Sequence, residues 1–178
     1  MTVTGPTVGQ QVGAEEYVQV QQFYARQMPL LDDRRFEEFL QTFTPDATLE
    51  HRPNGWRFDG RAAILAEMSG RRGDPDQPLA QQATPREARE AGIAAYDGLV
   101  YRYWFDKLAV RRVDGDGDTL QVRYQAMVSM TDRAGRVSFE PTTVVEDVLV
   151  RRDGAWYTRS RLVTHDNPGW ADSVHNPS

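Results

Sequence analysis

Residues 17–52 change from one hydrophobic period to another, and this change limits the folds open to the chain. Apolar side chains first recur at spacings of three and four, the period of a helix; they are Tyr17, Val20, Tyr24, Met28 and Leu31, followed by Phe36, Phe39, Leu40 and Phe43. Residues 47–52 then alternate as in a strand, where His51 faces the same side as Leu49. The segment predicts two helices, then Thr44-Pro45-Asp46 as a turn, then a strand with an inward-facing histidine.

Two adjacent aspartates, Asp32 and Asp33, lie between the two predicted helices. Short carboxylate side chains at such a turn can accept hydrogen bonds from the free N–H groups that begin the second helix. Since one aspartate is enough for that cap, the other can point toward the strand of His51. We expect Asp32 to be the inward residue, and the same reasoning leaves Asp33 open.

The rest of the chain turns from a helical pattern to strand patterns. Residues 60–68 predict a third helix, and the polar residues 69–85 predict an irregular loop. From residue 99 onward, side chains alternate in segments that turns separate, which are 99–113, 120–130, 136–152 and 156–165. Pro141 predicts a bulge or an edge position. Helices followed by an antiparallel meander predict an α+β fold, in which N-terminal helices pack in a curved sheet that forms a cone with an internal cavity.

The length of 178 residues predicts a single domain. The first 14 residues are small, polar and Gly-rich, which predicts a flexible arm (1–14), either disordered or loosely docked. Residues 167–178 predict a polar tail. The cone domain is then expected over 15–166. A domain of this size buries about 70% of its unfolded surface, which allows a core and a cavity together.

Composition excludes several classes of function. The chain has no cysteine, which rules out disulfides, thiolate catalysis and zinc–thiolate sites. Its net charge of -5, without a basic block, argues against nucleic acid as a partner. No apolar run approaches the ~18 residues of a membrane span, and the N-terminus lacks the basic and apolar regions of a signal peptide. We therefore expect a cytoplasmic protein with no membrane partner.

His51 is the strongest candidate for acid–base chemistry, because an imidazole exchanges protons near neutral pH. The alternative is a core histidine whose ring bonds a backbone carbonyl. Asp32, if it points inward, could orient this imidazole or hold a water against it. Large aromatic side chains would form the cavity wall or the core, as a pocket for a flat ligand requires; they include Tyr24, Trp56, Trp104 and Tyr124.

The phrase LLDDRRFEEFLQTFTPDATLEHRPNG, residues 30–55, carries a resemblance to the nuclear transport factor 2-like superfamily. This superfamily includes scytalone dehydratase, ketosteroid isomerase and the SnoaL-like polyketide cyclases, and the likeness covers roughly residues 15–165. Within it, QQFYARQMPLLDDRRF followed by TFTPDATLEH is similar to small bacterial polyketide cyclase/dehydratases. The pyran-forming enzymes of the actinorhodin type are the most similar group.

The resemblance implies a site. Asp32 corresponds to an aspartate of scytalone dehydratase, and His51 corresponds to an active-site tyrosine there and to the carboxylate base of ketosteroid isomerase. Tyr103 falls near a catalytic histidine of the dehydratase, and Thr143 falls on a polar substrate-binding position. The implied roles are His51 as general base or acid, Asp32 as its orienting carboxylate and Tyr103 as a hydrogen-bond donor to a carbonyl. The expected substrate-binding residues are Tyr24, Trp56, Tyr124 and Thr143.

The implied activity is a cofactor-independent polyketide cyclase/dehydratase, acting by general acid–base loss of water that closes a dihydropyran ring. An aldol-type cyclisation starts from the same proton removal. No HxxxH or HxD spacing supports a metal site. His165, beside Asp166 and Asn167, is expected at the surface, and a position at the cavity mouth is the alternative.

Other members of the superfamily provide alternatives. A noncatalytic cone would bind a ligand or pair with another subunit, as dioxygenase β subunits do, and would have a filled cavity or one without converging polar groups. An epoxide hydrolase would need an Asp–Arg–Asp set, for which Arg102 and Asp106 are the nearest hint. The superfamily also commonly dimerises through the outer face of its sheet, so a homodimer is possible.

Overall fold

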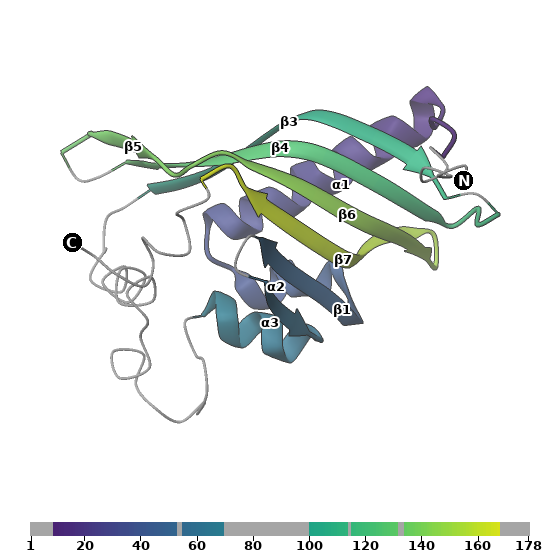
Figure 1. Cartoon of the computed structure of the whole chain (residues 1–178), viewed down its shortest axis with the longest axis horizontal. Coiled ribbons are helices and arrows are strands. Elements are labelled where there is room, and N and C mark those ends of the chain that lie inside the picture. The colour runs from purple at the N-terminus through teal and green to yellow at the C-terminus, as the bar shows by residue number, and fades with distance from the viewer. Residues whose placement is uncertain (1–8, 53–54, 70–99, 114, 132–133, 168–178) are drawn as a thin grey trace, which may run out of the picture.

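The computed structural model describes residues 9–52, 55–69, 100–113, 115–131 and 134–167. Within these residues, helices pack against the concave face of one curved sheet, as Figure 1 shows, and this confirms the predicted α+β fold. The helices are α1 (Ala14–Asp32), α2 (Phe36–Gln41) and α3 (Arg61–Met68). The strands are β1 (Phe43–Arg52), β2 (Trp56–Asp59), β3 (Val100–Arg112), β4 (Thr119–Thr131), β5 (Val137–Phe139), β6 (Thr143–Arg152) and β7 (Ala155–His165).

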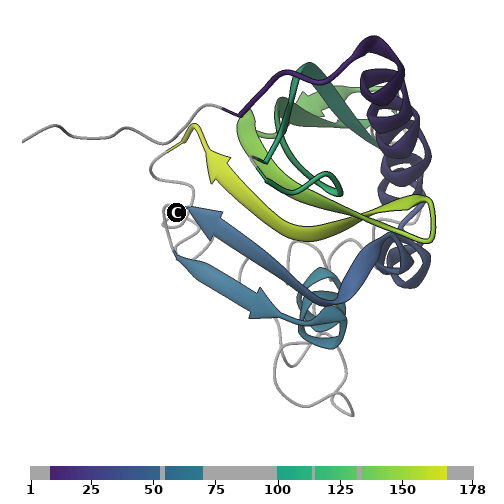
Figure 2. The same ribbon diagram turned by 90° about the vertical axis from the view of Figure 1, so that its right-hand side faces the viewer.

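The strand order in the sheet is β2-β1-β7-β6-β4-β3, and β5 pairs with one end of β4. All neighbours run antiparallel except β1 and β7, which are parallel. The predicted antiparallel meander is confirmed in β3, β4, β6 and β7. The expectation that the whole sheet is antiparallel is wrong at the β1–β7 pair, because alternation along a strand does not reveal which distant strand becomes its neighbour. Figure 2 shows the curvature of the sheet, with α1 along its open side.

The predicted strand over 136–152 is divided into β5 and β6. Pro141 lies between them and has no N–H group for a strand ladder, so pairing stops there. The prediction of a turn at Thr44-Pro45-Asp46 is also wrong, because these residues are part of strand β1. The pairing of β1 with β7 is irregular between Phe43 and Thr48, which accommodates the proline at the start of the strand.

Helix α1 ends in a turn that also corrects the expected cap. Asp32 is its last residue and Asp33 its C-cap, and Arg34 follows with a φ of 57°. The N–H groups of Arg34 and Arg35 donate to the carbonyls of Leu31 and Leu30, which is the Schellman pattern of a helix end. The N-cap of α2 is Arg35, with no side-chain cap bond, so neither aspartate caps this helix.

The N-terminal arm is docked for part of its length. The carbonyl of Gln10 accepts a hydrogen bond from the N–H of Arg112 at 2.9 Å, and Gln11 forms a bridge with Arg111 on β3. Residues 9–11 therefore lie along the edge strand β3, which agrees with the docked alternative for this part of the arm. Residues 1–8, most of the predicted loop 69–85 and the tail from 168 onward lie outside the described residues.

Candidate active site

A cavity of about 270 Å³ lies between the helices and the concave face of the sheet. This volume is close to the lower end of the ~300–1,000 Å³ typical of ligand pockets, so it suits a small ring system. Apolar and aromatic side chains form most of the wall, among them Met28, Leu31, Phe39, Phe43, Leu49, Ile64, Met68, Tyr101, Tyr103, Trp104, Tyr124, Val145 and Val163. Its polar lining residues are His51, Glu67, Glu140, Thr143, Arg161 and His165.

The register of the sheet arranges the inward side chains in rows across the strands. One row runs Tyr124, Val145, Val163 and His51, from β4 to β1. The next row toward the end of β7 runs Ala126, Thr143 and His165. The row on the other side places Asp147 beside Arg161 and Arg161 beside Leu49. The rows thus supply Arg161 on one side of the cavity, Thr143 and His165 on the other, and His51 at the end of the middle row.

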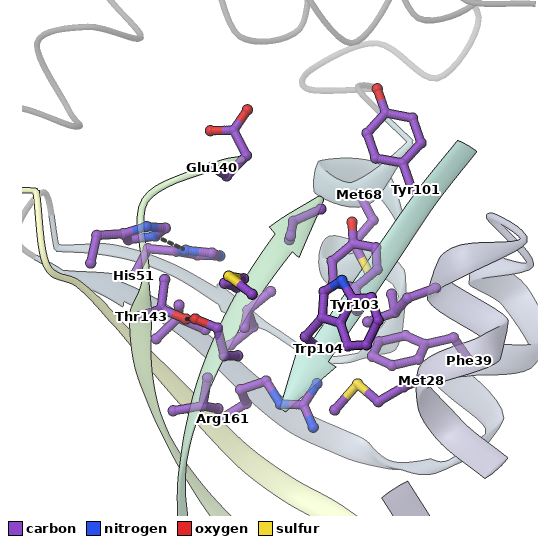
Figure 3. A pocket seen from close by; sticks show the side chains of 18 of the residues that line it. Met28, Phe39, His51, Met68, Tyr101, Tyr103, Trp104, Glu140, Thr143 and Arg161 are labelled. Atoms are coloured by element: carbon purple, nitrogen blue, oxygen red, sulfur yellow. Dashed lines mark hydrogen bonds between the residues drawn. The ribbon is translucent and has the colours of Figure 1, made fainter. Parts of the chain in front are cut away.

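Two histidines from strands far apart in the sequence meet in this cavity. Nδ1 of His51 lies 3.1 Å from Nε2 of His165, and the two rings are nearly parallel at 19° (Figure 3). Only one of these nitrogens can donate while the other accepts, so the pair shares one proton between its rings. The expected surface position of His165 is wrong, because the β1–β7 pairing turns its ring toward His51.

At the other side of the cavity, Arg161 belongs to a buried network. Its Nε and Nη2 atoms donate to the two oxygens of Asp147 at 2.9 and 2.7 Å, and Nη2 also donates to Oε1 of Gln27 at 2.8 Å. The hydroxyl of Tyr24 donates to Oδ2 of Asp147 at 2.8 Å. The side chains of Arg161 and Asp147 are 7% and 0% exposed, so the ion pair is shielded from water.

Burial and charge act against each other in this network. Burial alone disfavours the guanidinium, but the nearby Asp147 carboxylate, with Tyr124 and Tyr24, outweighs it, and the pKa of Arg161 lies above its usual range. Burial raises the pKa of Tyr24 well above 10, and the Asp147 charge adds to this effect. Burial likewise raises the pKa of Tyr124, against the smaller opposing effect of Arg161. Both tyrosines therefore keep their protons, and Arg161 keeps its charge.

Asp32 does not reach His51. Its Oδ1 accepts a hydrogen bond from the backbone N–H of Tyr103 at 2.7 Å, and its Oδ2 lies 3.8 Å from Arg102. It is absent from the residues that line the cavity. The expectation that Asp32 orients the imidazole is wrong, because the C-terminus of α1 lies against β3 and not against β1. Asp32 fixes the backbone of Tyr103, whose side chain does line the cavity.

The expected substrate-binding residues divide into two groups. Tyr124 and Thr143 line the cavity. Tyr24 is fully buried, with its hydroxyl bonded to Asp147, and Trp56 lies on β2 opposite His51, so neither is among the lining residues. Tyr24 faces inward from α1 as its helical spacing predicts, but it is packed behind the cavity wall.

Sequence reasoning missed Arg161, Asp147 and Glu67. Asp147 lies two residues from Val145 and from Leu149, so its side chain points to the same face of the strand as theirs. A charged residue on this apolar face was the available signal. Glu67 lies three residues after the buried Ile64 on α3, and the helical period places both on one face. Arg161 gave no such signal. The β6–β7 register is irregular between Val148 and Leu149, so the alternation of inward and outward side chains along β7 is interrupted before Arg161.

The described residues contain no cluster of potential metal ligands and no helix that could span a membrane. No three histidine, aspartate or glutamate side chains there are grouped so that they could hold a metal ion. No helix in the same part of the chain is both long and apolar enough to cross a membrane.

Comparison with known proteins identifies the family. The model of the SnoaL-like domain matches residues 13–162, and the chain therefore belongs to the SnoaL-like family. A search of curated proteins gives no match. The fold and the site together thus define a SnoaL-like cone with a paired-histidine cavity.

Several solved structures are similar over most of the chain. Aln2 from a Streptomyces species is 32% identical, with a TM-score of 0.69 over 88% of this chain and 95% of that chain. ActVI-ORFA from Streptomyces coelicolor is 28% identical, with a TM-score of 0.67 over 86% and 98%. A protein from Catenulispora acidiphila in complex with S-DNPA is 33% identical, with a TM-score of 0.66 over 89% and 99%.

Proposed function

We propose that this protein is a cofactor-independent polyketide cyclase/dehydratase that removes water from a β-hydroxyketone or hemiketal intermediate. The observation that carries the proposal is the pair of imidazoles, 3.1 Å apart, in an apolar cavity of a SnoaL-like protein. An acid–base group in such a cavity works without competition from bulk water. Membership of the SnoaL-like family and the similarity to Aln2 and ActVI-ORFA support a polyketide cyclase/dehydratase.

The histidine pair supplies the proton transfers. His51 donates through Nδ1 to Nε2 of His165, and this tautomer leaves the lone pair of His51 on its own Nε2. That nitrogen takes the proton from the carbon next to the substrate carbonyl. The resulting imidazolium then gives the proton to the departing hydroxyl, which leaves as water while the carbon–carbon double bond forms. His165 stabilises the charged intermediate ring and holds its orientation, the role first expected of Asp32.

The cavity supplies the geometry. Flat aromatic walls hold a polyketide chain folded, which favours one ring closure over others. Tyr103 lines the same cavity, and the bond from its backbone to Asp32 holds this part of β3 in place. Its phenol is a suitable donor to the carbonyl that gains negative charge when the proton leaves. An aldol-type cyclisation begins with the same step and uses the same groups.

The noncatalytic alternative has less support. It predicts a filled cavity or one without converging polar groups, whereas this cavity is open and two imidazoles converge in it. The epoxide hydrolase alternative needs two aspartates around an arginine. Among the described residues Arg161 pairs with Asp147 alone, and that carboxylate does not line the cavity.

The proposal is tested by measuring water loss from a panel of β-hydroxyketone and hemiketal polyketide mimics, by absorbance and mass. We expect wild-type turnover that EDTA leaves unchanged, and a loss of about 100-fold or more in His51→Gln. Arg57→Gln is the matched control, since its side chain is exposed on β2 and pairs with Asp59 outside the cavity. Equal turnover by wild type and His51→Gln, or a loss of activity on chelation, would refute the proposal.

A further inference from the structure

One nitrogen of the Arg161 guanidinium, Nη1, takes no part in the buried network. Nε donates to Asp147, and Nη2 donates to both Asp147 and Gln27. These bonds use three of the five N–H donors of an arginine. The remaining two belong to Nη1, which has no hydrogen-bond partner among the described residues, although the Arg161 side chain is only 7% exposed and lines the cavity. Figure 3 shows Arg161 on the side of the cavity away from Glu140.

Tyr124 provides a second donor of the same kind. Its side chain lines the cavity, and its ring is held by edge contacts with Tyr24 and Phe105. Its hydroxyl forms no hydrogen bond within the part of the chain that the structure describes, yet the residue is only 1% exposed. Tyr124 and Arg161 lie on the two strands that flank β6, opposite Val145 and Asp147, and Tyr24 contacts the Tyr124 ring while its hydroxyl bonds Asp147.

Neither donor is among the fully buried polar atoms without a partner, so each has some surface open to the cavity. Both donors here border a cavity, so a ligand oxygen can satisfy them. The network behind them carries no net charge, because the carboxylate of Asp147 balances the guanidinium. A neutral acceptor such as a ketone or quinone oxygen therefore fits better than a carboxylate, which would bring an unbalanced charge into the cavity.

We propose that Nη1 of Arg161 and the hydroxyl of Tyr124 together bind a ketone or quinone oxygen on the ring system of the substrate. The assignment of this ligand as part of an aromatic polyketide rests on the proposed function. The two residues are specificity-determining groups that anchor the far end of the substrate.

The anchored oxygen is separate from the reacting carbonyl. Arg161 and His165 are four positions apart on β7, which corresponds to about 13 Å of strand. Tyr124 lies in the same cross-strand row as His51 but three strand spacings away, or about 14 Å. A substrate held at both places has its reacting carbon at the histidines and its ring oxygen at the donor pair.

The test uses two bicyclic probes of nearly the same shape, 1-tetralone with a ketone and tetralin without one. Affinities are measured by quenching of tryptophan fluorescence, and the carbonyl stretch of bound ¹³C-labelled 1-tetralone is measured by infrared difference spectroscopy. We expect wild type to prefer the ketone by about tenfold or more, since a hydrogen bond from a charged donor gives a gain of this size. The bound carbonyl should absorb at lower frequency than in hexane.

Two variants remove one donor each. Tyr124→Phe deletes only the hydroxyl, and Arg161→Lys keeps the charge beside Asp147 but removes Nη1. Each should lower the ketone preference several-fold, leave tetralin affinity unchanged and raise the carbonyl frequency. Tyr17→Phe is the matched control, because its hydroxyl bonds the carbonyl of Leu108 and does not line the cavity. If Arg161→Lys does not fold, Tyr124→Phe alone decides.

The proposal is overturned if both variants keep the wild-type preference and frequency, or if wild type does not bind 1-tetralone. Neither readout involves turnover. A protein that binds the ketone as described but does not dehydrate any mimic would therefore contradict the proposed function and support the donor pair. A protein that dehydrates a mimic but shows no ketone preference would support the proposed function and contradict the donor pair.

Discussion

Asp147→Asn is the substitution whose effect on stability follows most directly from the structure. The Asp147 side chain is 0% exposed and accepts hydrogen bonds from Nε and Nη2 of Arg161 and from the hydroxyl of Tyr24. An asparagine of the same shape replaces one acceptor oxygen with an NH₂ group that faces existing donors. It also leaves the buried guanidinium without a counter-charge.

Breaking a buried ion pair from one side costs about 3–5 kcal/mol, since the remaining charge is uncompensated. A domain of this type has roughly 5–15 kcal/mol of stability, so the loss is a large share of it. With a urea dependence of about 2 kcal/mol per molar, the unfolding midpoint should fall by roughly 1.5–2.5 M.

Urea unfolding monitored by tryptophan fluorescence gives the midpoint. The double variant Asp147→Leu with Arg161→Met should recover most of the loss, because apolar groups of similar volume replace both charges. Glu38→Gln is the control, since its ion pair with Arg35 is exposed and a surface pair contributes little. A midpoint for Asp147→Asn within experimental error of wild type would refute the assignment of Arg161 and Asp147 as a buried ion pair that stabilises the fold.

Three further results are expected. As the pH rises through 10, tyrosines of the unfolded chain ionise while the buried Tyr124 keeps its proton. Wild type should therefore lose stability by up to about 1.4 kcal/mol per pH unit more than Tyr124→Phe. Urea midpoints near pH 9 and pH 11 test this, and an equal change in both proteins would contradict it. Gly9→Ala places a Cβ 2.1 Å from a backbone oxygen of β3 and should cost about 1–3 kcal/mol of stability, whereas Gly13→Ala has open space around it and should be tolerated. Equal thermal denaturation temperatures for the two variants would refute the docking of the arm. Asp32→Asn retains an acceptor for the Tyr103 N–H and should keep most of the turnover, whereas Asp32→Ala should lose about tenfold. Equal losses of turnover in both variants would instead indicate a role for the carboxylate charge.

Local periodicity was sufficient to predict the order of the helices and of the longer strands, but it joined β5 to β6. The helical spacing of Val20, Tyr24 and Met28 corresponds to the buried face of α1, and the alternation of Leu49 and His51 corresponds to the inner face of β1. These patterns depend only on neighbouring residues, so they can be read from the chain alone. The inward position of His51 was predicted for the same reason.

The partner of His51 could not be predicted in this way. His165 is 114 residues away in the sequence, and it reaches His51 only because β1 and β7 pair in parallel. Alternation gives the face of each strand but not its neighbour. The resemblance to scytalone dehydratase favoured Asp32 as the partner, but in this chain that carboxylate binds the backbone of β3.

The charged network was missed for two different physical reasons. Asp147 had a readable signal, since it is a carboxylate between the buried Val145 and Leu149 on one strand face. Arg161 had none, because the irregular pairing near Thr158 breaks the alternation of β7. Buried charges are placed by the partner that neutralises them, and that partner is fixed only when the strands are in register.

The most direct test of the account is a double-mutant cycle on the two histidines. Turnover of a hemiketal mimic is measured for wild type, His51→Gln, His165→Gln and the double variant, with circular dichroism to verify folding. If the imidazoles act as one acid–base unit, each single substitution lowers kcat by about 100-fold or more, and the double variant is no slower than the slower single one. Losses that multiply, or a His165→Gln variant as active as wild type, would contradict the account.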